Sequence, residues 1–258
     1  MGIIYENIMI EKNIPCIKLH TYDSIDSTSS QLKRMIESCE SIDDYTVVTA
    51  SHQSGGRGQG TNRWSSNASE NLTFSFLLRP MIEACQHFYL NMCISLGIKK
   101  ALDRYIDGVK IKWPNDIYVN NCKLCGILIE STIMGGKISR SIIGVGINVE
   151  QKEWEDWVPN PTSMALCGAR AVDKDTLLKE VLESIQHYIS LLHDGEQSKI
   201  SATYHDVMYR KDIAALYSDI EGTFEGVICG VDDDGRLMIK RVESGVISRY
   251  MFKEVKYL

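Results

Sequence analysis

Apolar and polar residues recur with two different periods along the first two thirds of the chain. Alternation with a period of two, or a short apolar run, predicts a strand, and an apolar residue every three or four positions predicts a helix. Strands are predicted over residues 17–22, 45–50, 71–78, 109–112, 117–119, 124–129 and 138–149. Helices are predicted from residues 26–28 to about 37, and over 87–105, 173–192 and 200–209. Helices mixed with hairpin strands indicate an α+β fold rather than a doubly wound parallel sheet.

Two of these segments carry more specific expectations. Leu72, Phe74 and Phe76 alternate with other residues, which predicts a half-buried strand with one apolar face. Asn120-Asn121 lies between two strand patterns, and asparagine tolerates the left-handed conformation that a tight turn requires. A hairpin is therefore predicted at this position.

The sequence changes character near its C-terminus. Short β-branched runs are separated there by glycines and by the acidic turn Asp232-Asp-Asp-Gly235. The pattern predicts a small barrel-like β domain over residues 211–258, after a larger domain over residues 1–210. The acidic turn lacks the ligand spacing and the terminal glutamate of an EF-hand, so a hairpin turn is favoured over a calcium site.

Composition excludes several classes of protein. The net charge of −6 argues against a general nucleic-acid binder, which usually presents a basic face. No apolar run reaches the ~20 residues that span a bilayer, and Glu6 and Glu11 interrupt the N-terminal apolar residues, which argues against a signal peptide. The eight cysteines are therefore predicted to be free thiols of a cytoplasmic protein.

Cys122 and Cys125 form a C-x-x-C pair, a spacing that occurs in zinc sites and in redox-active sites. A structural zinc site needs four ligands, and neither a second C-x-x-C nor a closely spaced histidine pair exists in the sequence. A redox pair would open a helix, whereas Cys125 enters an apolar strand pattern. Chance spacing is the better account, and no structural metal is predicted.

The glycine-rich segment 51–66 is the first candidate for chemistry. Four glycines between residues 55 and 60 let the backbone approach a ligand closely, and Arg57 and Arg63 offer guanidinium groups suited to carboxylate or phosphate. Trp64 adds a flat apolar face. The segment is predicted to close over an anionic ligand; the alternative is a surface loop whose arginines are merely solvated.

A second polar cluster surrounds the predicted hairpin. Lys112, Asn115, Asp116 and Lys123 all lie near strand ends, where polar side chains are firmly positioned. Residues 154–161 contain tryptophan and proline without periodicity and are predicted to form an irregular loop that walls the same site.

Together these segments carry a family resemblance. In chain order, Asp26-Ser27-Thr28, Gly56-Arg57-Gly58 with Trp64, Lys112-Trp-Pro-Asn-Asp116 with Lys123-x-x-Gly126-Ile-Leu-x-Glu130, and Gly144-Val-Gly-Ile-Asn148 resemble the signatures of the biotin protein ligases. The resemblance covers essentially the whole chain. It implies a mixed-sheet catalytic domain of the biotin/lipoate ligase type followed by a small SH3-like β-barrel domain.

The resemblance also implies an activity. Biotin protein ligases use ATP and Mg²⁺ to activate biotin as biotinyl-5′-AMP, and transfer it to one lysine of a biotin carboxyl carrier protein or domain. Some relatives add an N-terminal winged-helix domain that represses transcription, but only about 25 residues precede Asp26-Ser27-Thr28 here. The short, purely enzymatic form is expected, as a monomer or weak homodimer without specific DNA or membrane partners.

The matching motifs assign roles to individual residues. Biotin is assigned to Ser27, Thr28, Ser29, Gln53, Gly56, Arg57, Gly58, Gln59, Lys123 and Gly126. The nucleotide is assigned to Arg63, Trp64, Lys112, Asn115, Asp116 and Asn148. Lys123 and Arg57 are the implied catalytic residues, because each would bring positive charge to the biotin carboxylate and the α-phosphate. Simpler roles stay open: a helix N-cap for Ser27 and Thr28, and a structural salt bridge between Lys112 and Asp116.

The chain departs from the commonest family pattern at two positions. Gln59 stands where many relatives have a second arginine, and Ser29 stands where many have asparagine. Loss of the second arginine places more of the retention of the intermediate on Arg57 and Lys123. Two rival functions also remain, a lipoate-type ligase and a non-enzymatic biotin-sensing protein.

Overall fold

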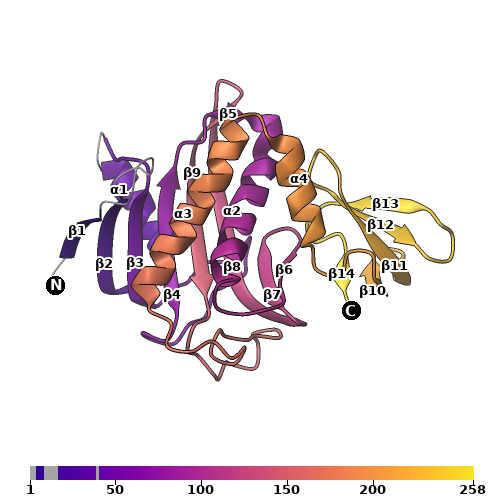
Figure 1. Cartoon of the computed structure of the whole chain (residues 1–258), viewed down its shortest axis with the longest axis horizontal. Helices are drawn as coiled ribbons and strands as arrows, with labels where there is room; N and C mark the ends of the chain where they lie inside the picture. Colours follow the sequence, from indigo (N-terminus) through magenta and orange to yellow (C-terminus); the bar gives the residue numbers. More distant parts are fainter. Residues whose placement is uncertain (1–3, 9–16, 39–40) are drawn as a thin grey trace.

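The computed structural model describes residues 4–8, 17–38 and 41–258, which form two β-sheets and four α-helices (Figure 1). The strands are β1 Ile4–Ile8, β2 Ile17–Ile25, β3 Thr46–Gln53, β4 Leu72–Leu78, β5 Ile82–Glu83, β6 Val109–Lys112, β7 Asp116–Val119, β8 Cys122–Met134, β9 Lys137–Ile147, β10 Ala214–Asp219, β11 Gly222–Val231, β12 Leu237–Arg241, β13 Ile247–Tyr250 and β14 Lys256–Tyr257. The helices are α1 Thr28–Ser38, α2 His87–Leu102, α3 Lys174–His193 and α4 Gln197–Asp206. Glu11, Cys16 and Cys39 lie outside the described residues.

The larger sheet runs in the order β1-β2-β3-β4-β9-β8-β7-β6, with β5 paired to β9. Strands β2 and β3 are parallel, whereas the other pairs in this sheet are antiparallel. A mixed sheet with helices packed on it confirms the predicted α+β class. Asn120 has a φ of 54° in the tight turn between β7 and β8, as predicted for the hairpin.

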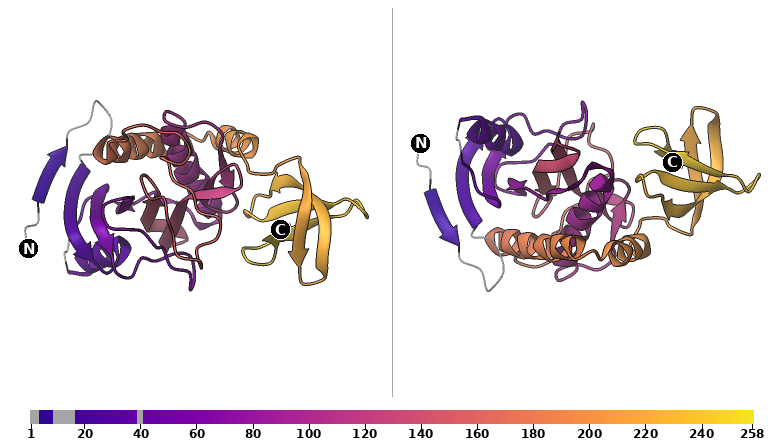
Figure 2. Two further views of the ribbon diagram at one scale, coloured as in Figure 1. Left: turned by 90° about the horizontal axis from the view of Figure 1, so that it is seen from below. Right: turned by 90° about the horizontal axis from the view of Figure 1, so that it is seen from above.

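Helices cover both faces of the larger sheet. Helices α2 and α3 lie on one face, and α1 lies on the opposite one, as both views in Figure 2 show. Phe74 and Phe76 belong to the main hydrophobic core, whereas Leu77 packs with Leu32 of α1 and Val48 of β3. The prediction of a half-buried β4 was wrong, because every residue of β4 is buried. Alternation within one strand could not reveal that a second helix layer covers its other face.

The helix predictions agree with the structure except at their ends. Helix α2 ends at Leu102 rather than at residue 105, and α4 runs over Gln197–Asp206 rather than over residues 200–209. Asp173 caps α3, since its carboxylate accepts a hydrogen bond from the Thr176 amide at 2.8 Å.

The C-terminal residues form the predicted β module, a five-stranded sheet in the order β13-β12-β11-β10-β14. Figure 2 shows this sheet at one end of the molecule and β1 at the other. The acidic turn is a hairpin turn, because the Asp232 carboxylate accepts from the amides of Asp234 and Arg236. The domain boundary after residue 210 stays a prediction.

Helices α2 and α3 approach each other closely at Gly97 of α2. A Cβ atom added there would lie 2.6 Å from the Ile185 Cα atom of α3. Alanine favours a helix over glycine by about 1 kcal/mol, but overpacking of a core costs about 1–3 kcal/mol. We expect Gly97→Ala to lower the free energy of unfolding, measured by urea denaturation, despite its better helix propensity.

Gly55→Ala is the matched control for Gly97→Ala. Its added Cβ atom would lie 3.4 Å from its nearest neighbour, the carbonyl oxygen of Asp26, which is ordinary contact. A Gly97→Ala protein as stable as Gly55→Ala, or more stable, would contradict the close helix contact.

Candidate functional site

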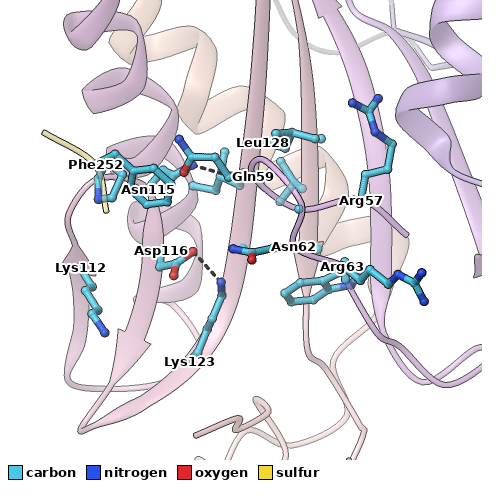
Figure 3. A pocket seen from close by; sticks show the side chains of 18 of the residues that line it. Arg57, Gln59, Asn62, Arg63, Lys112, Asn115, Asp116, Lys123, Leu128 and Phe252 are labelled. Carbon is cyan, nitrogen blue, oxygen red and sulfur yellow. Dashed lines mark hydrogen bonds and ion pairs between the residues drawn. The ribbon is translucent and has the colours of Figure 1, made fainter. Parts of the chain in front are cut away.

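A cavity of about 790 Å³ opens where the glycine-rich segment, the turn after β6 and the C-terminal segment meet (Figure 3). Of the residues that the sequence singled out, those lining it are Ser27, Thr28, Ser29, Gln53, Arg57, Gly58, Gln59, Arg63, Trp64, Lys112, Asn115, Asp116, Lys123 and Gly126. Gly56 and Asn148 do not line it. Segments far apart in the sequence thus converge on one cavity.

Hydroxyl and amide groups gather at the start of α1. Ser75 of β4 shares hydrogen bonds with the side chains of Thr28 at 2.7 Å and Ser29 at 2.9 Å. The Gln53 side-chain carbonyl accepts from the Thr28 amide at 2.8 Å and so satisfies one N–H of the first helical turn. Ser27 directly precedes the helix, but the Ser30 amide lies 3.5 Å from its Oγ atom, too far for a strong cap. Ser75 was missed because nothing in β4 distinguishes it from other buried strand residues.

The Trp64 ring lies against two paired glycines. Gly126 of β8 and Gly146 of β9 stand opposite each other in the sheet. A Cβ atom added to Gly146 would lie 2.3 Å from the Trp64 ring, and one added to Gly126 would lie 2.9 Å from it. Two residues before Gly146 in β9, a Cβ atom on Gly144 would lie 2.6 Å from the Ser29 Oγ atom. Only glycine at these positions lets the indole and the serine approach the sheet.

The glycine-rich segment folds back on itself as a short hairpin. The Trp64 amide donates to the Gly56 carbonyl at 3.0 Å, and the Gly58 amide donates to the Asn62 carbonyl at 2.9 Å. A Cβ atom on Gly56 would lie 2.3 Å from the Trp64 carbonyl oxygen. Gly56 therefore closes the hairpin rather than lining the cavity.

The guanidinium groups of Arg57 and Arg63 are directed away from the pair formed by Lys123 and Asp116 (Figure 3). Arg57 makes two hydrogen bonds with the Glu130 carboxylate, at 2.6 and 3.0 Å. Both side chains of this pair are 40% exposed. Exposed ion pairs contribute only about 0–1 kcal/mol, so an anion in the cavity can compete with Glu130 for Arg57.

Lys123, and not Lys112, is the partner of Asp116. The Lys123 ammonium lies 2.7 Å from an Asp116 carboxylate oxygen and 6.0 Å from the centre of the Trp64 ring. The alternative of a Lys112–Asp116 salt bridge is wrong, because the Lys112 side chain lies over the rings of Tyr118 and Tyr257. Charge and strand position alone did not distinguish two lysines that flank the same aspartate.

Asn148 faces a neighbouring cavity of about 670 Å³, which Lys123, Trp64 and the loop over residues 154–161 also line. The Asn148 Nδ2 atom donates to the Thr162 carbonyl at 2.8 Å. Its Oδ1 atom and the Trp64 Nε1 atom are buried and have no hydrogen-bond partner among the described residues. The irregular loop walls the site, as predicted. Asn115, by contrast, is held by a 2.6 Å hydrogen bond from its Nδ2 atom to the Ile127 carbonyl.

The C-terminal segment contributes lining residues that the sequence did not suggest. They are Phe252, Lys253, Val255, Lys256 and Tyr257. No motif marks them, and they reach the cavity only because the second sheet packs beside the first. Asn62, Leu128 and Pro159 also line the cavity; no individual role was predicted for them, although each lies inside a segment that the sequence singled out.

Cys122 and Cys125 are free thiols in β8. Burial raises the pKa of the Cys125 thiol far above its usual range, so this group stays protonated near neutral pH. Within the described part of the chain, no three histidine, cysteine or acidic side chains form a group that could hold a metal ion. No helix there is both long and apolar enough to cross a bilayer.

Comparison with known proteins finds that the chain is similar to biotin ligases. The model of the biotin/lipoate A/B protein ligase family matches residues 22–148. The chain is 27% identical over 235 residues to the bifunctional ligase/repressor BirA of Escherichia coli, covering 90% of this chain and 71% of BirA. It is 24% identical to the biotin–[acetyl-CoA-carboxylase] ligase of Paracoccus denitrificans, covering 83% of this chain and 91% of that one.

Solved structures show the same likeness. Biotin protein ligase from Aquifex aeolicus, in complex with biotin and ATP, superposes with a TM-score of 0.75 at 25% identity. The superposition covers 93% of this chain and 99% of that one. The structural likeness therefore extends over both sheets and is not limited to the region that carries the motifs.

The environment of Lys112 predicts a dependence of stability on pH. Burial lowers the pKa of Lys112, so the unfolded chain, with a lysine pKa near ~10.4, binds this proton more tightly than the folded protein. Stability should therefore increase as the pH rises from the lowered pKa towards that value. We expect the free energy of unfolding of the parent, relative to Lys112→Met, to increase over this window in urea titrations.

Lys110→Met is the control, because Lys110 lies on the same strand, is exposed and does not line the cavity. It reports the effect of losing one positive charge at the surface. Equal pH dependence in both variants would show that burial of Lys112 has no energetic consequence.

Proposed function

We propose that the chain, whose residues 22–148 match the model of the biotin/lipoate A/B protein ligase family, is an ATP-dependent biotin protein ligase. In the first step a carboxylate oxygen of biotin attacks the α-phosphate of ATP, which gives biotinyl-5′-AMP and releases pyrophosphate. In the second step the ε-amine of a lysine on a biotin carboxyl carrier protein or domain attacks the acyl carbon, and AMP leaves.

The observation that carries this proposal is the order of groups along one face of β9. Residues two apart on a strand point to the same face, about 6–7 Å apart. Ser29 lies over Gly144, Trp64 lies over Gly146, and Asn148 follows at the strand end. Hydroxyls, an aromatic face and an amide thus succeed one another, with Lys123 beside the middle position. A molecule with a polar ring, an apolar chain, a carboxylate and then a nucleoside matches this order.

The hydroxyl-rich end suits the ureido ring of biotin. This ring has two N–H donors and one carbonyl acceptor, and each costs free energy if buried without a partner. Ser29, Thr28 and Gln53 supply hydroxyl and amide groups there, and Ser75 holds the first two in place. The N-cap position of Ser27 is compatible with this role.

The middle of the cavity suits the reacting centre. Attack of a carboxylate on a phosphate joins two anions, so preorganised positive charge at the transition state accelerates it. Lys123 supplies that charge from a strand, and Asp116 orients it. Arg57 would join it by exchanging Glu130 for the substrate anion. Release of pyrophosphate then takes place towards Lys112.

The second cavity suits the nucleoside. Adenine carries an amino group that donates and ring nitrogens that accept hydrogen bonds. The unpartnered Asn148 Oδ1 atom and Trp64 Nε1–H offer the complementary acceptor and donor. Both groups would gain a partner on binding, which removes the cost of leaving them buried and unsatisfied.

Mg²⁺, when bound, would neutralise phosphate charge. It usually keeps several waters and binds through substrate phosphates with one or two carboxylates. Asp116 is the carboxylate among the described lining residues. This donor set fits an ion that enters with the nucleotide rather than one held in a protein cage.

The carrier protein would approach at the open side of the cavity. The acidic net charge of this chain is compatible with a protein partner, and specific DNA binding is not part of the proposal. The expected form is a monomer or weak homodimer.

Isotope exchange of pyrophosphate into ATP tests the activation step. The pure protein should catalyse exchange only when biotin is present, because the α-phosphate needs the biotin carboxylate as its nucleophile. Lipoate in place of biotin should support little exchange. Absence of exchange with biotin would overturn the proposal, and faster exchange with lipoate would redirect it to the lipoate branch of the family.

Lys123→Met should slow biotin adenylation in single-turnover measurements. Loss of one preorganised contact to developing charge typically costs ~10²–10³ in rate. Lys110→Met, which removes an exposed lysine of β6, should adenylate at the parent rate. A Lys123→Met protein that matches this control would show that Lys123 does not act on the transition state.

A further inference from the structure

Lys112 is held between two aromatic rings that come from different sheets. Its ammonium lies 4.5 Å from the centre of the Tyr118 ring of β7 and 4.6 Å from that of the Tyr257 ring of β14. It also donates to the Tyr118 hydroxyl at 3.2 Å. The larger sheet therefore supplies one side of this clamp and the C-terminal sheet supplies the other.

Tyr257 is itself firmly placed. Strand β14 pairs with β10, where Tyr257 stands opposite Tyr217. The Tyr257 ring packs at 66° against Tyr217, with ring centres 5.4 Å apart, and stacks on Tyr209 at 6.2 Å. Packing on two sides fixes the ring, so its face is a rigid platform for the lysine.

The clamp explains how Lys112 stays available to an anion. Within the described residues no carboxylate forms a salt bridge with Lys112, and Asp116 is taken by Lys123. A ring face attracts an ammonium group without replacing the N–H donors that a phosphate would accept. A lysine side chain is otherwise flexible and strongly hydrated. Two rings therefore orient the charge without neutralising it.

We propose that Tyr257 is a positioning residue, which holds the Lys112 ammonium where the β- and γ-phosphates of the nucleotide lie and pyrophosphate leaves. The inference rests on the proposed function, and it extends that function to the last strand of the C-terminal sheet. Tyr257 contacts no reacting atom and acts through Lys112. Its ring, rather than its hydroxyl, performs the task, because the ring faces the ammonium.

The test compares Tyr257→Leu with the conservative variant Tyr257→Phe. In pyrophosphate exchange, Tyr257→Leu should raise the KM for ATP roughly 3- to 30-fold, in the range of one cation–π contact, with a smaller change in kcat. Tyr257→Phe keeps the ring and should retain the parent KM. In a Lys112→Met background, Tyr257→Leu should cause no further increase.

Phe224→Leu is the matched control. The Phe224 ring carries the Arg241 guanidinium 4.0 Å from its centre, within the same C-terminal sheet but outside the cavity lining. The variant removes one cation–π contact, that between Arg241 and the Phe224 ring, and should leave the KM for ATP unchanged. An equal rise in KM in Phe224→Leu would assign the effect to general loosening of the sheet and overturn the proposal.

Calorimetric binding of inorganic pyrophosphate separates this inference from the proposed function. Tyr257→Leu should bind pyrophosphate more weakly than the parent but no more weakly than Lys112→Met, and Tyr257→Phe as tightly as the parent. If the parent shows no biotin-dependent exchange, the ligase function fails, yet this binding pattern would still support the clamp. Parent-like binding by Tyr257→Leu, no pyrophosphate binding by the parent, or equal losses in Tyr257→Leu and Tyr257→Phe would overturn it.

Discussion

The contact between the Trp64 indole and the paired glycines of β8 and β9 is the constraint on which the site depends. A side chain at Gly126 or Gly146 would overlap the ring, so neither strand can carry a side chain where the indole lies. The indole in turn fixes the end of the glycine-rich hairpin, through the hydrogen bond between Trp64 and Gly56. The position of the loop over the cavity therefore follows from two missing side chains in adjacent strands.

Three of the positive charges around the cavity are held in different ways, which suits three different tasks. Lys123 is oriented by Asp116 on a strand, Arg57 is paired with an exposed carboxylate that an anion can displace, and Lys112 is held by aromatic rings. A uniform set of tight salt bridges would neutralise the site, and a set of free side chains would lose orientation. The observed mixture keeps charge available while limiting the conformational entropy that binding must remove.

Local sequence patterns predicted most elements of the fold, because strand and helix periods depend on neighbouring residues. They also predicted that Lys112, Asn115, Asp116 and Lys123 would lie together, since a hairpin brings strand ends into proximity. They failed where a second element decides the outcome. Burial of both faces of β4 depends on α1, and the partner of Asp116 depends on the reach of a lysine from the next strand. The lining residues at the C-terminus depend on how two sheets pack, which no local period encodes.

The turn between β6 and β7 is fixed from outside its own sheet. The Trp113 indole N–H donates at 2.9 Å to the carbonyl of Gly235, which lies in the turn between β11 and β12 of the C-terminal sheet. Gly235 has a φ of 82°, and a Cβ atom there would lie 2.4 Å from the Phe88 ring of α2. Only glycine satisfies both the backbone conformation and the close approach. Because Trp113 follows Lys112 directly, the contact with Gly235 anchors the backbone of the same lysine whose ammonium the C-terminal sheet clamps. Displacement of the C-terminal sheet would therefore move both the backbone and the ammonium group of Lys112. The C-terminal sheet thus helps to determine the geometry of the cavity.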